Sequence, residues 1–112
     1  MILITGPLFA GKKEYACRAL GLSREELARR AVWDVQELAA RAEDLEKLAE
    51  ELARHEIVIS TEVGGGVVPV DREERRAREA AGRLACLLAG RADCVVRVCC
   101  GLPQVLKGEL PC

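Results

Sequence analysis

The fold of this chain is decided by its first thirteen residues, Met1-Ile-Leu-Ile-Thr-Gly-Pro-Leu-Phe-Ala-Gly-Lys-Lys13. A short apolar run leads into Gly6, and four residues separate Gly6 from Gly11 and Lys12. This is the spacing of a phosphate-binding loop between a buried strand and a helix. The sequence therefore predicts a strand, then a loop that binds an anion, then a helix.

The chemistry of such a loop comes from its backbone. Successive N–H groups form a concave site for phosphate, and the positive end of the following helix adds to the attraction. The lysine supplies a point charge to the β- and γ-phosphates. The candidate nucleotide-binding residues here are Gly6, Pro7, Leu8, Phe9, Ala10, Gly11, Lys12 and Lys13. The alternative is an ordinary strand–turn–helix with no ligand.

Lys13 departs from the loop motif, which places Ser or Thr at this position to put a hydroxyl on Mg²⁺. Without that hydroxyl, an accompanying Mg²⁺ would be held by phosphate and water. Phosphate binding is compatible with a second lysine. Phosphoryl transfer depends on metal positioning, so it is expected to suffer more.

The size and charge of the chain limit its organisation and partners. Its 112 residues are enough for one domain, predicted over residues 1–112. The net charge is −1, from 17 basic and 18 acidic residues, so no strong field favours nucleic acid or an anionic membrane. No apolar run approaches the roughly 20 residues of a membrane span. The start does not resemble a signal peptide, and we expect a cytoplasmic location.

The six cysteines form no Cys-x-x-Cys pair, and the sequence contains one histidine, His55. In the cytosol we expect reduced thiols rather than disulfides. Cys94 and Cys99 lie in a valine-rich run and are expected to be small buried side chains. Too few ligands stand at suitable spacing for a metal site, and none is predicted.

Apolar patterns along the rest of the chain alternate between strand and helix. Helices are predicted over residues 11–20, 23–30, 37–54 and 71–90, and strands over 2–5, 31–35, 57–60 and 94–99. The tail after these elements is expected to be irregular. The alternation indicates an α/β fold with a small parallel sheet and helices on its faces, a P-loop NTPase-like three-layer sandwich.

A second candidate segment, Ser60–Pro69, follows a predicted strand and contains Glu62 and Gly64. In an open parallel sheet, ligands bind beyond the carboxyl ends of the strands. Glu62 would contact a metal, a hydroxyl or a ribose there, and glycines would let the backbone approach a ligand. The alternative is a flexible glycine-rich connector with a solvated glutamate.

This segment resembles a known family. Glu62-Val-Gly-x-Gly-Val-Val-Pro69 is similar to the "Asn-Glu-Val-Gly-x-Gly-Ile-Val-Pro" segment of the bifunctional adenosylcobinamide kinase / adenosylcobinamide-phosphate guanylyltransferase family. The similarity continues through Ala81-Gly82-Arg83-Leu84, Ala92-Asp93 and Gly101-Leu-Pro103, and the first strand and loop look like the family's own. It covers residues 1–15 and about 56–107.

The resemblance implies a P-loop-like enzyme of cobalamin synthesis. Such enzymes phosphorylate adenosylcobinamide and then transfer GMP from GTP through a guanylyl-histidine. It also implies that GTP or ATP is bound and that adenosylcobinamide is a partner. Gly6, Gly11 and Lys12 match the family's nucleotide loop, while Glu62 and Gly64 match its Glu-Val-Gly motif. In a "Trp-x-Thr-x-Glu" stretch, Trp33 and Glu37 match a tryptophan and a GTP-contacting glutamate.

The chain also departs from the family. The guanylyl-accepting histidine precedes the tryptophan in the family, whereas His55 follows Trp33 here. The family's central strand with its Cys-x-Thr is missing, and Thr61 replaces the asparagine before Glu62. The sequence predicts a shortened member that binds GTP or ATP weakly without guanylyl transfer, and leaves residual kinase activity open. The alternatives are a regulatory or assembly subunit, pairing with itself or another protein, and a generic P-loop small-molecule kinase.

Overall fold

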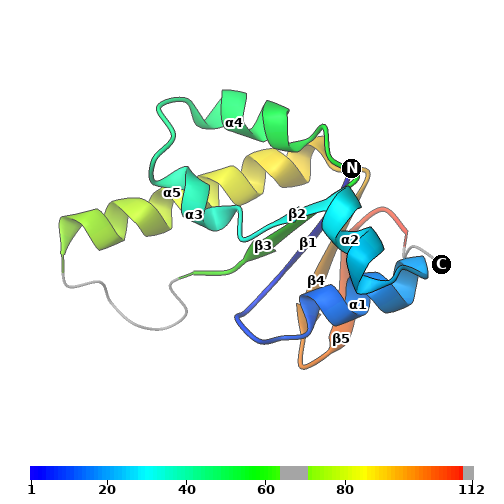
Figure 1. The fold of residues 1–112 in the computed structure, drawn as a ribbon. Coiled ribbons are helices and arrows are strands. Elements are labelled where there is room, and N and C mark those ends of the chain that lie inside the picture. Colours follow the sequence, from blue (N-terminus) through cyan, green and yellow to red (C-terminus); the bar gives the residue numbers. More distant parts are fainter. Residues whose placement is uncertain (64–70, 110–112) are drawn as a thin grey trace.

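A computed structural model of the chain describes residues 1–63 and 71–109, and within them one sheet of five strands carries helices on both faces (Figure 1). The strands are β1 (Ile2–Gly6), β2 (Ala31–Trp33), β3 (Ile57–Thr61), β4 (Cys94–Cys99) and β5 (Leu102–Lys107). The helices are α1 (Lys12–Leu20), α2 (Arg24–Arg30), α3 (Gln36–Ala39), α4 (Leu45–Leu52) and α5 (Arg72–Arg91). The strand order is β2-β3-β1-β4-β5.

β1 lies at the centre of the sheet, in parallel with β3 on one side and β4 on the other. Its first residue, Ile2, stands opposite Ile57 of β3 and Cys94 of β4. β2 pairs in parallel with β3, so the weak strand predicted over residues 31–35 exists and is shorter than expected. The predicted parallel arrangement is confirmed for these four strands.

Side chains alternate between two core layers because successive residues of a strand point to opposite faces. Leu3 and Val58 pack under α3, α4 and α5, whereas Ile4 and Ile59 pack under α1 and α2. Figure 1 shows the same division, with α1 and α2 on one side of the sheet and α3, α4 and α5 on the other. The predicted three-layer sandwich is confirmed.

The ends of the first two helices are as predicted. Gly21 ends α1 in the left-handed conformation, with φ 65°. The Ser23 hydroxyl accepts the N–H of Glu26 while the Glu26 carboxylate accepts the N–H of Ser23, which forms a capping box. These local bonds satisfy backbone groups that a helix end leaves unpaired.

The single helix predicted over residues 37–54 is wrong. The structure has the one-turn α3, a connection, and a separate α4. Asp44 explains the break, because its extended backbone and its carboxylate, which accepts the N–H groups of Glu46 and Lys47, begin a new helix. The apolar spacing continues across the break because both helices pack on α5.

The irregular tail is also wrong, because residues 102–107 form β5, which pairs antiparallel with β4. Cys99 stands opposite Leu102, so Cys100 and Gly101 form the turn, with φ 54° and 74°. Positive φ at both central residues is typical of a type I′ hairpin turn. The sequence has proline and glycine here, which favoured an irregular tail. An exposed edge strand buries neither face, so its sequence shows no apolar alternation from which the strand could be predicted.

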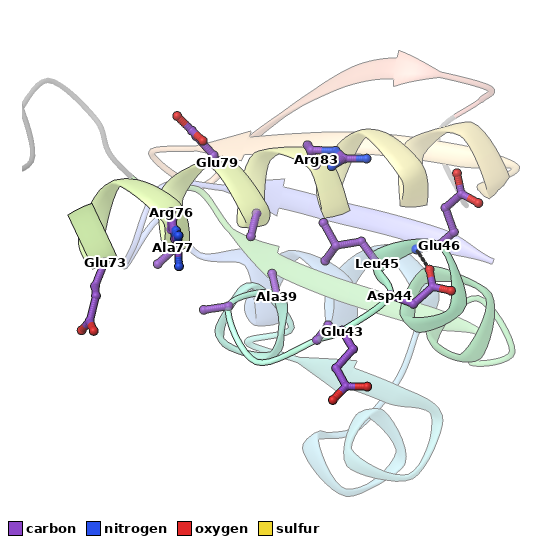
Figure 2. Close-up of a pocket in the computed structure, with 13 residues that line it drawn as sticks. Ala39, Glu43, Asp44, Leu45, Glu46, Glu73, Arg76, Ala77, Glu79 and Arg83 are labelled. Atoms are coloured by element: carbon purple, nitrogen blue, oxygen red, sulfur yellow. Dashed lines mark hydrogen bonds between the residues drawn. The ribbon is translucent and has the colours of Figure 1, made fainter.

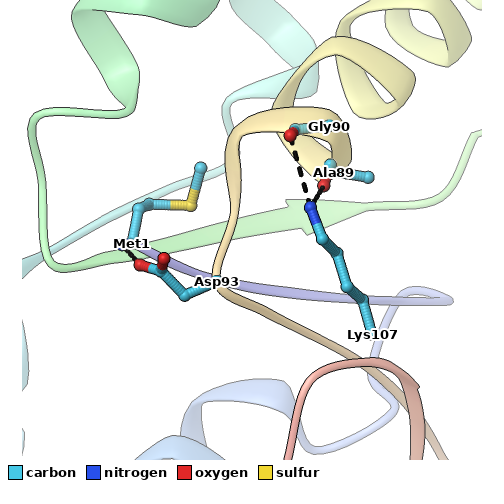
Figure 3. A network of polar contacts seen from close by, with 5 residues as sticks. All are labelled: Met1, Ala89, Gly90, Asp93 and Lys107. Atoms are coloured by element: carbon cyan, nitrogen blue, oxygen red, sulfur yellow. Dashed lines mark hydrogen bonds and ion pairs between the residues drawn. The ribbon is translucent and has the colours of Figure 1, made fainter.

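The predicted stop of the last helix at Gly90 is wrong by one residue, since α5 continues through Arg91. Lys107 of β5 donates to the main-chain carbonyls of Ala89 and Gly90, at 3.0 and 3.3 Å (Figure 3). A lysine is favourable there because the last carbonyls of a helix carry partial negative charge. The hairpin is thereby fastened to the end of α5.

Cys94 is 7% exposed, as predicted, and its thiol donates to the carbonyl of Glu109. Burial raises the pKa of this thiol. Cys99 is only half-buried, so its predicted burial is wrong. None of the helices in the described ranges combines the length and hydrophobicity needed to cross a bilayer.

Candidate functional site

The loop after β1 has the backbone shape that its glycines predict. Gly6 has φ 151°, and a Cβ there would collide with the carbonyl oxygen of Val98. Gly11, which directly precedes α1, has φ 88°, and Phe9 has φ 58°. Residues with a Cβ rarely adopt these values, so glycine permits the turn at positions 6 and 11, and Phe9 carries local strain at the carboxyl edge of the sheet.

Lys12 lies within this turn instead of in solvent. The residue is 8% exposed, and its ammonium donates to the Pro7 carbonyl at 2.7 Å. Burial lowers the pKa of Lys12, and the negative charges of Asp34, Glu62 and Glu14 oppose that shift. The loop therefore surrounds a buried cation that has one neutral hydrogen-bond partner.

The loop's own donors are available. Within the described part of the chain, the N–H groups of Leu8, Phe9 and Gly11 have no hydrogen-bond acceptor. The turn between β4 and β5 supports the loop from behind, because the N–H of Gly101 donates to the Ala10 carbonyl at 2.8 Å. Unpaired N–H groups at the start of a helix are suited to an anion.

Lys13 points elsewhere. Its ammonium lies over the ring of Trp33, 4.3 Å from the ring centroid. This cation–π contact joins the start of α1 to the end of β2. Lys13 therefore replaces the expected hydroxyl with a contact to the end of β2, two strands away from β1 in the sheet.

Glu62 lies next to the loop, as predicted. Its N–H donates to the Gly6 carbonyl at 2.8 Å. Its carboxylate accepts two hydrogen bonds from Arg97 of β4, at 2.6 and 3.0 Å from Nε and Nη2. These bonds raise the pKa of Arg97. Glu62 is thus paired with an arginine and is not an uncommitted metal ligand.

Glu37 lies apart from the loop. It is exposed on α3 and lines a groove of about 620 Å³ between α3 and α5, together with Val63 and Arg78. A second, smaller groove, of about 140 Å³, shares Val63 and Arg78 and reaches Glu62. The structure therefore brings Glu62 to the loop and places Glu37 in an adjoining groove.

Another hollow, of about 830 Å³, contains none of the predicted residues. Figure 2 shows it between α5 and the segment that joins α3 to α4. Its walls carry Arg76 and Arg83 of α5, and Glu43 and Asp44 opposite them. Because it is formed by the outer helices, it is a different place from the loop edge.

Three further points from the sequence concern Gly64, His55 and metal binding. Gly64 lies outside the described residues. His55 precedes β3, so it lies at the amino edge of the sheet, away from the loop, with Nδ1 3.2 Å from the Leu52 carbonyl. Among the residues that the structure describes, no three His, Cys, Asp or Glu side chains gather as a metal site would require.

The sequence reasoning missed two residues. Asp34 follows β2 with φ 56° and acts electrostatically on Lys12. Arg97 is the one charged residue in the run Cys94–Cys99. A charge inside an apolar strand is unusual enough to have marked Arg97 as a candidate. Only strand order, however, places it beside β1.

Residues 17–106 match the family described as "Cobinamide kinase / cobinamide phosphate guanyltransferase". The chain belongs to this family. Its P-loop NTPase-like α/β class, predicted from the sequence, is confirmed by that match together with the fold.

One curated relative is the "Bifunctional adenosylcobalamin biosynthesis protein CobP" of Pseudomonas aeruginosa. It is 40% identical over 76 residues, which is 68% of this chain and 44% of the relative. The chain thus spans less than half the length of that protein. The cobinamide kinase family match begins after the loop, at residue 17, so the loop's role depends on its own geometry.

Proposed function

We propose that this member of the cobinamide kinase family binds the phosphates of GTP or ATP at residues 6–13 and lacks guanylyl transfer. The observation that carries the proposal is the buried Lys12, whose ammonium is enclosed by a turn with positive φ at Gly6, Phe9 and Gly11, at the carboxyl edge of a parallel sheet. Such a cation, next to loop N–H groups that have no acceptor among the described residues, is complementary to a phosphate.

Weak affinity follows from what the loop lacks. Lys13 offers no hydroxyl to Mg²⁺ and is engaged with Trp33. Glu62, the nearest acidic residue after β3, is engaged with Arg97. With neither group directed to a metal, Mg²⁺ would rely on phosphate and water, and phosphoryl transfer would lose much of its metal positioning.

Loss of guanylyl transfer follows from the histidine. A nucleophile that accepts GMP must reach the α-phosphate, which would lie over the loop. His55, at the opposite edge of the sheet, is outside that reach. Adenosylcobinamide, as the acceptor for any residual phosphoryl transfer, and a cytoplasmic location remain predictions.

Isothermal titration calorimetry with GTP and with ATP, each with and without Mg²⁺, tests the binding proposal. Lys12→Met removes the buried charge and keeps the length of the side chain. Lys47→Met, on the exposed side of α4, is the matched control. We expect binding by the parent and the control and loss of binding by Lys12→Met. No heat at millimolar nucleotide would contradict the proposal.

Transfer is tested separately with GTP labelled in the α-phosphate. We expect no acid-labile, protein-bound GMP after denaturing electrophoresis. A labelled band that disappears in His55→Gln would show that the histidine reaches the nucleotide and that this part of the proposal is wrong.

A second candidate, assembly with another copy of the chain, is favoured by β5. All six residues of this edge strand are exposed, including Leu102 at 71% and Leu106 at 56%. An exposed apolar edge is prone to pair with another strand. Light scattering tests this candidate: an oligomer that becomes monomeric in Leu106→Lys supports it, and a concentration-independent monomer contradicts it.

A further inference from the structure

The ion pair between Glu62 and Arg97 spans the place where the phosphate loop begins. Arg97 of β4 stands in register with Thr5 of β1. On the other side of β1, Glu62 follows β3 and its N–H donates to the Gly6 carbonyl. β1 lies between these two strands. The two side chains therefore meet across the end of β1, directly before the turn that encloses Lys12.

Two cations act on the Glu62 carboxylate. Arg97 donates two hydrogen bonds to it, at 2.6 and 3.0 Å. Lys12 also interacts with it electrostatically. Burial lowers the pKa of Lys12, and the negative charge of Glu62 opposes this shift, as that of Asp34 does more strongly. The pair is partly open to solvent, with 36% of the Arg97 side chain and 39% of the Glu62 side chain exposed. A ligand can therefore reach it.

A carboxylate that pairs with a guanidinium and interacts electrostatically with an ammonium is chemically similar to a phosphate in the same place. Arginine recognises both groups with two parallel N–H···O bonds. A terminal phosphate of a nucleotide held by the loop would need cations in the same region. Arg97 is therefore suited to such a phosphate, and its partner in the ligand-free chain is an acidic side chain of the protein.

We propose that Glu62 occupies the position of a terminal phosphate and that Arg97 is a phosphate-binding residue, which exchanges Glu62 for the ligand. The ion pair then acts as an intramolecular competitor that weakens nucleotide binding. This inference depends on the proposed function, because it assumes that residues 6–13 bind the nucleotide. It assigns Glu62 a role opposite to direct contact with a metal or ribose.

The two roles of Glu62 predict opposite signs. If Glu62 competes with the ligand, removing its charge strengthens binding. If Glu62 contacts metal or ribose, the same change weakens it. In either case Glu62→Gln raises the net charge, so a matched change is needed. Glu56→Gln provides it, because Glu56 pairs with Arg30 at 2.7 Å at the amino edge of the sheet, away from the loop.

Calorimetric titration with GTP, GMP and inorganic triphosphate, at one ionic strength, tests the exchange. We expect Glu62→Gln to bind GTP and triphosphate about tenfold more tightly than the parent chain, the factor that one charge-assisted hydrogen bond represents. Arg97→Gln should bind both ligands about tenfold more weakly. The affinity for GMP should change little in these variants, and Glu56→Gln should bind every ligand with the affinity of the parent chain.

Arg97→Lys is a second test in case Arg97→Gln fails to fold. It keeps the positive charge but loses the two parallel hydrogen bonds of arginine, so we expect an affinity between those of the parent and Arg97→Gln. Thermal denaturation establishes that each variant is folded. Weaker or unchanged binding by Glu62→Gln overturns the exchange, and so does unchanged binding by both Arg97 variants. Binding of GTP by Glu62→Gln but not by the parent chain would strongly support the exchange. If neither the parent nor any folded variant binds GTP or triphosphate, the proposed function fails and the exchange fails with it.

Discussion

The ammonium of Lys13 lies 4.3 Å from the centroid of the Trp33 ring. Lys13 stands at the position where the loop motif has a hydroxyl, and this contact engages its side chain. Trp33 is the only tryptophan of the chain, so its fluorescence reports on the start of α1. The same contact joins the loop to the end of β2, where Asp34 stands. Events at the loop should therefore be visible in the tryptophan emission.

Lys13→Ser restores the hydroxyl and removes the cation–π contact. We expect nucleotide binding to become tighter with Mg²⁺ than without it, because serine supplies a protein ligand to the metal. The contact itself is worth about 0.5–1 kcal/mol, so stability should fall only slightly. Titration of Trp33 fluorescence with GTP, with and without Mg²⁺, measures the affinity, and urea unfolding measures the stability. Mg²⁺-independent binding in this variant would contradict a phosphate-loop geometry.

The lowered pKa of Lys12 predicts that nucleotide affinity depends on pH. Burial lowers the pKa of this lysine, with Asp34, Glu62 and Glu14 opposing the change. Only the protonated ammonium attracts phosphate, so affinity should fall with rising pH earlier than for an ordinary exposed lysine. Calorimetry from neutral to alkaline pH, with Lys47→Met as control, measures the slope. Affinity that stays constant up to the pH at which exposed lysines titrate would count against a role for Lys12.

Gly6→Ala should disrupt the loop. The φ of 151° is unfavourable for alanine, and its Cβ would collide with the Val98 carbonyl. We expect the free energy of unfolding to fall by about 1–3 kcal/mol from backbone strain, with loss of binding. Gly82→Ala is the control, because nothing lies within 4 Å of a Cβ at this helical position. It should raise stability by about 0.5–1 kcal/mol. Urea unfolding compares the two.

Cys100→Asn should stabilise the turn that supports the loop. Cys100 has φ 54°, a value that asparagine tolerates better than cysteine. We expect an increase of up to about 1 kcal/mol in the free energy of unfolding. Cys86→Asn, at an exposed position on α5, should leave it nearly unchanged, since cysteine and asparagine have similar helix propensities. Equal effects of the two variants would contradict the turn argument.

Much of the fold could be predicted because its signals are local. The buried strands are continuous apolar runs, and the capping box of Ser23 and Glu26 is contained in four residues. The break at Asp44 was missed because α3 and α4 continue one apolar spacing on the same partner helix. β5 was missed because an exposed edge strand needs no buried side, so only its pairing with β4 reveals it.

The sequence by itself determined the alternation of strands and helices, the glycine spacing of the loop, and the substitution of its hydroxyl by Lys13. These features lie within a few residues of one another, where backbone geometry and side-chain period act directly. Only the tertiary structure decided that Lys12 is buried, that Lys13 turns to Trp33, and that Glu62 meets Arg97. Those contacts depend on which strands flank β1, and strand order is set by the packing of the whole sheet.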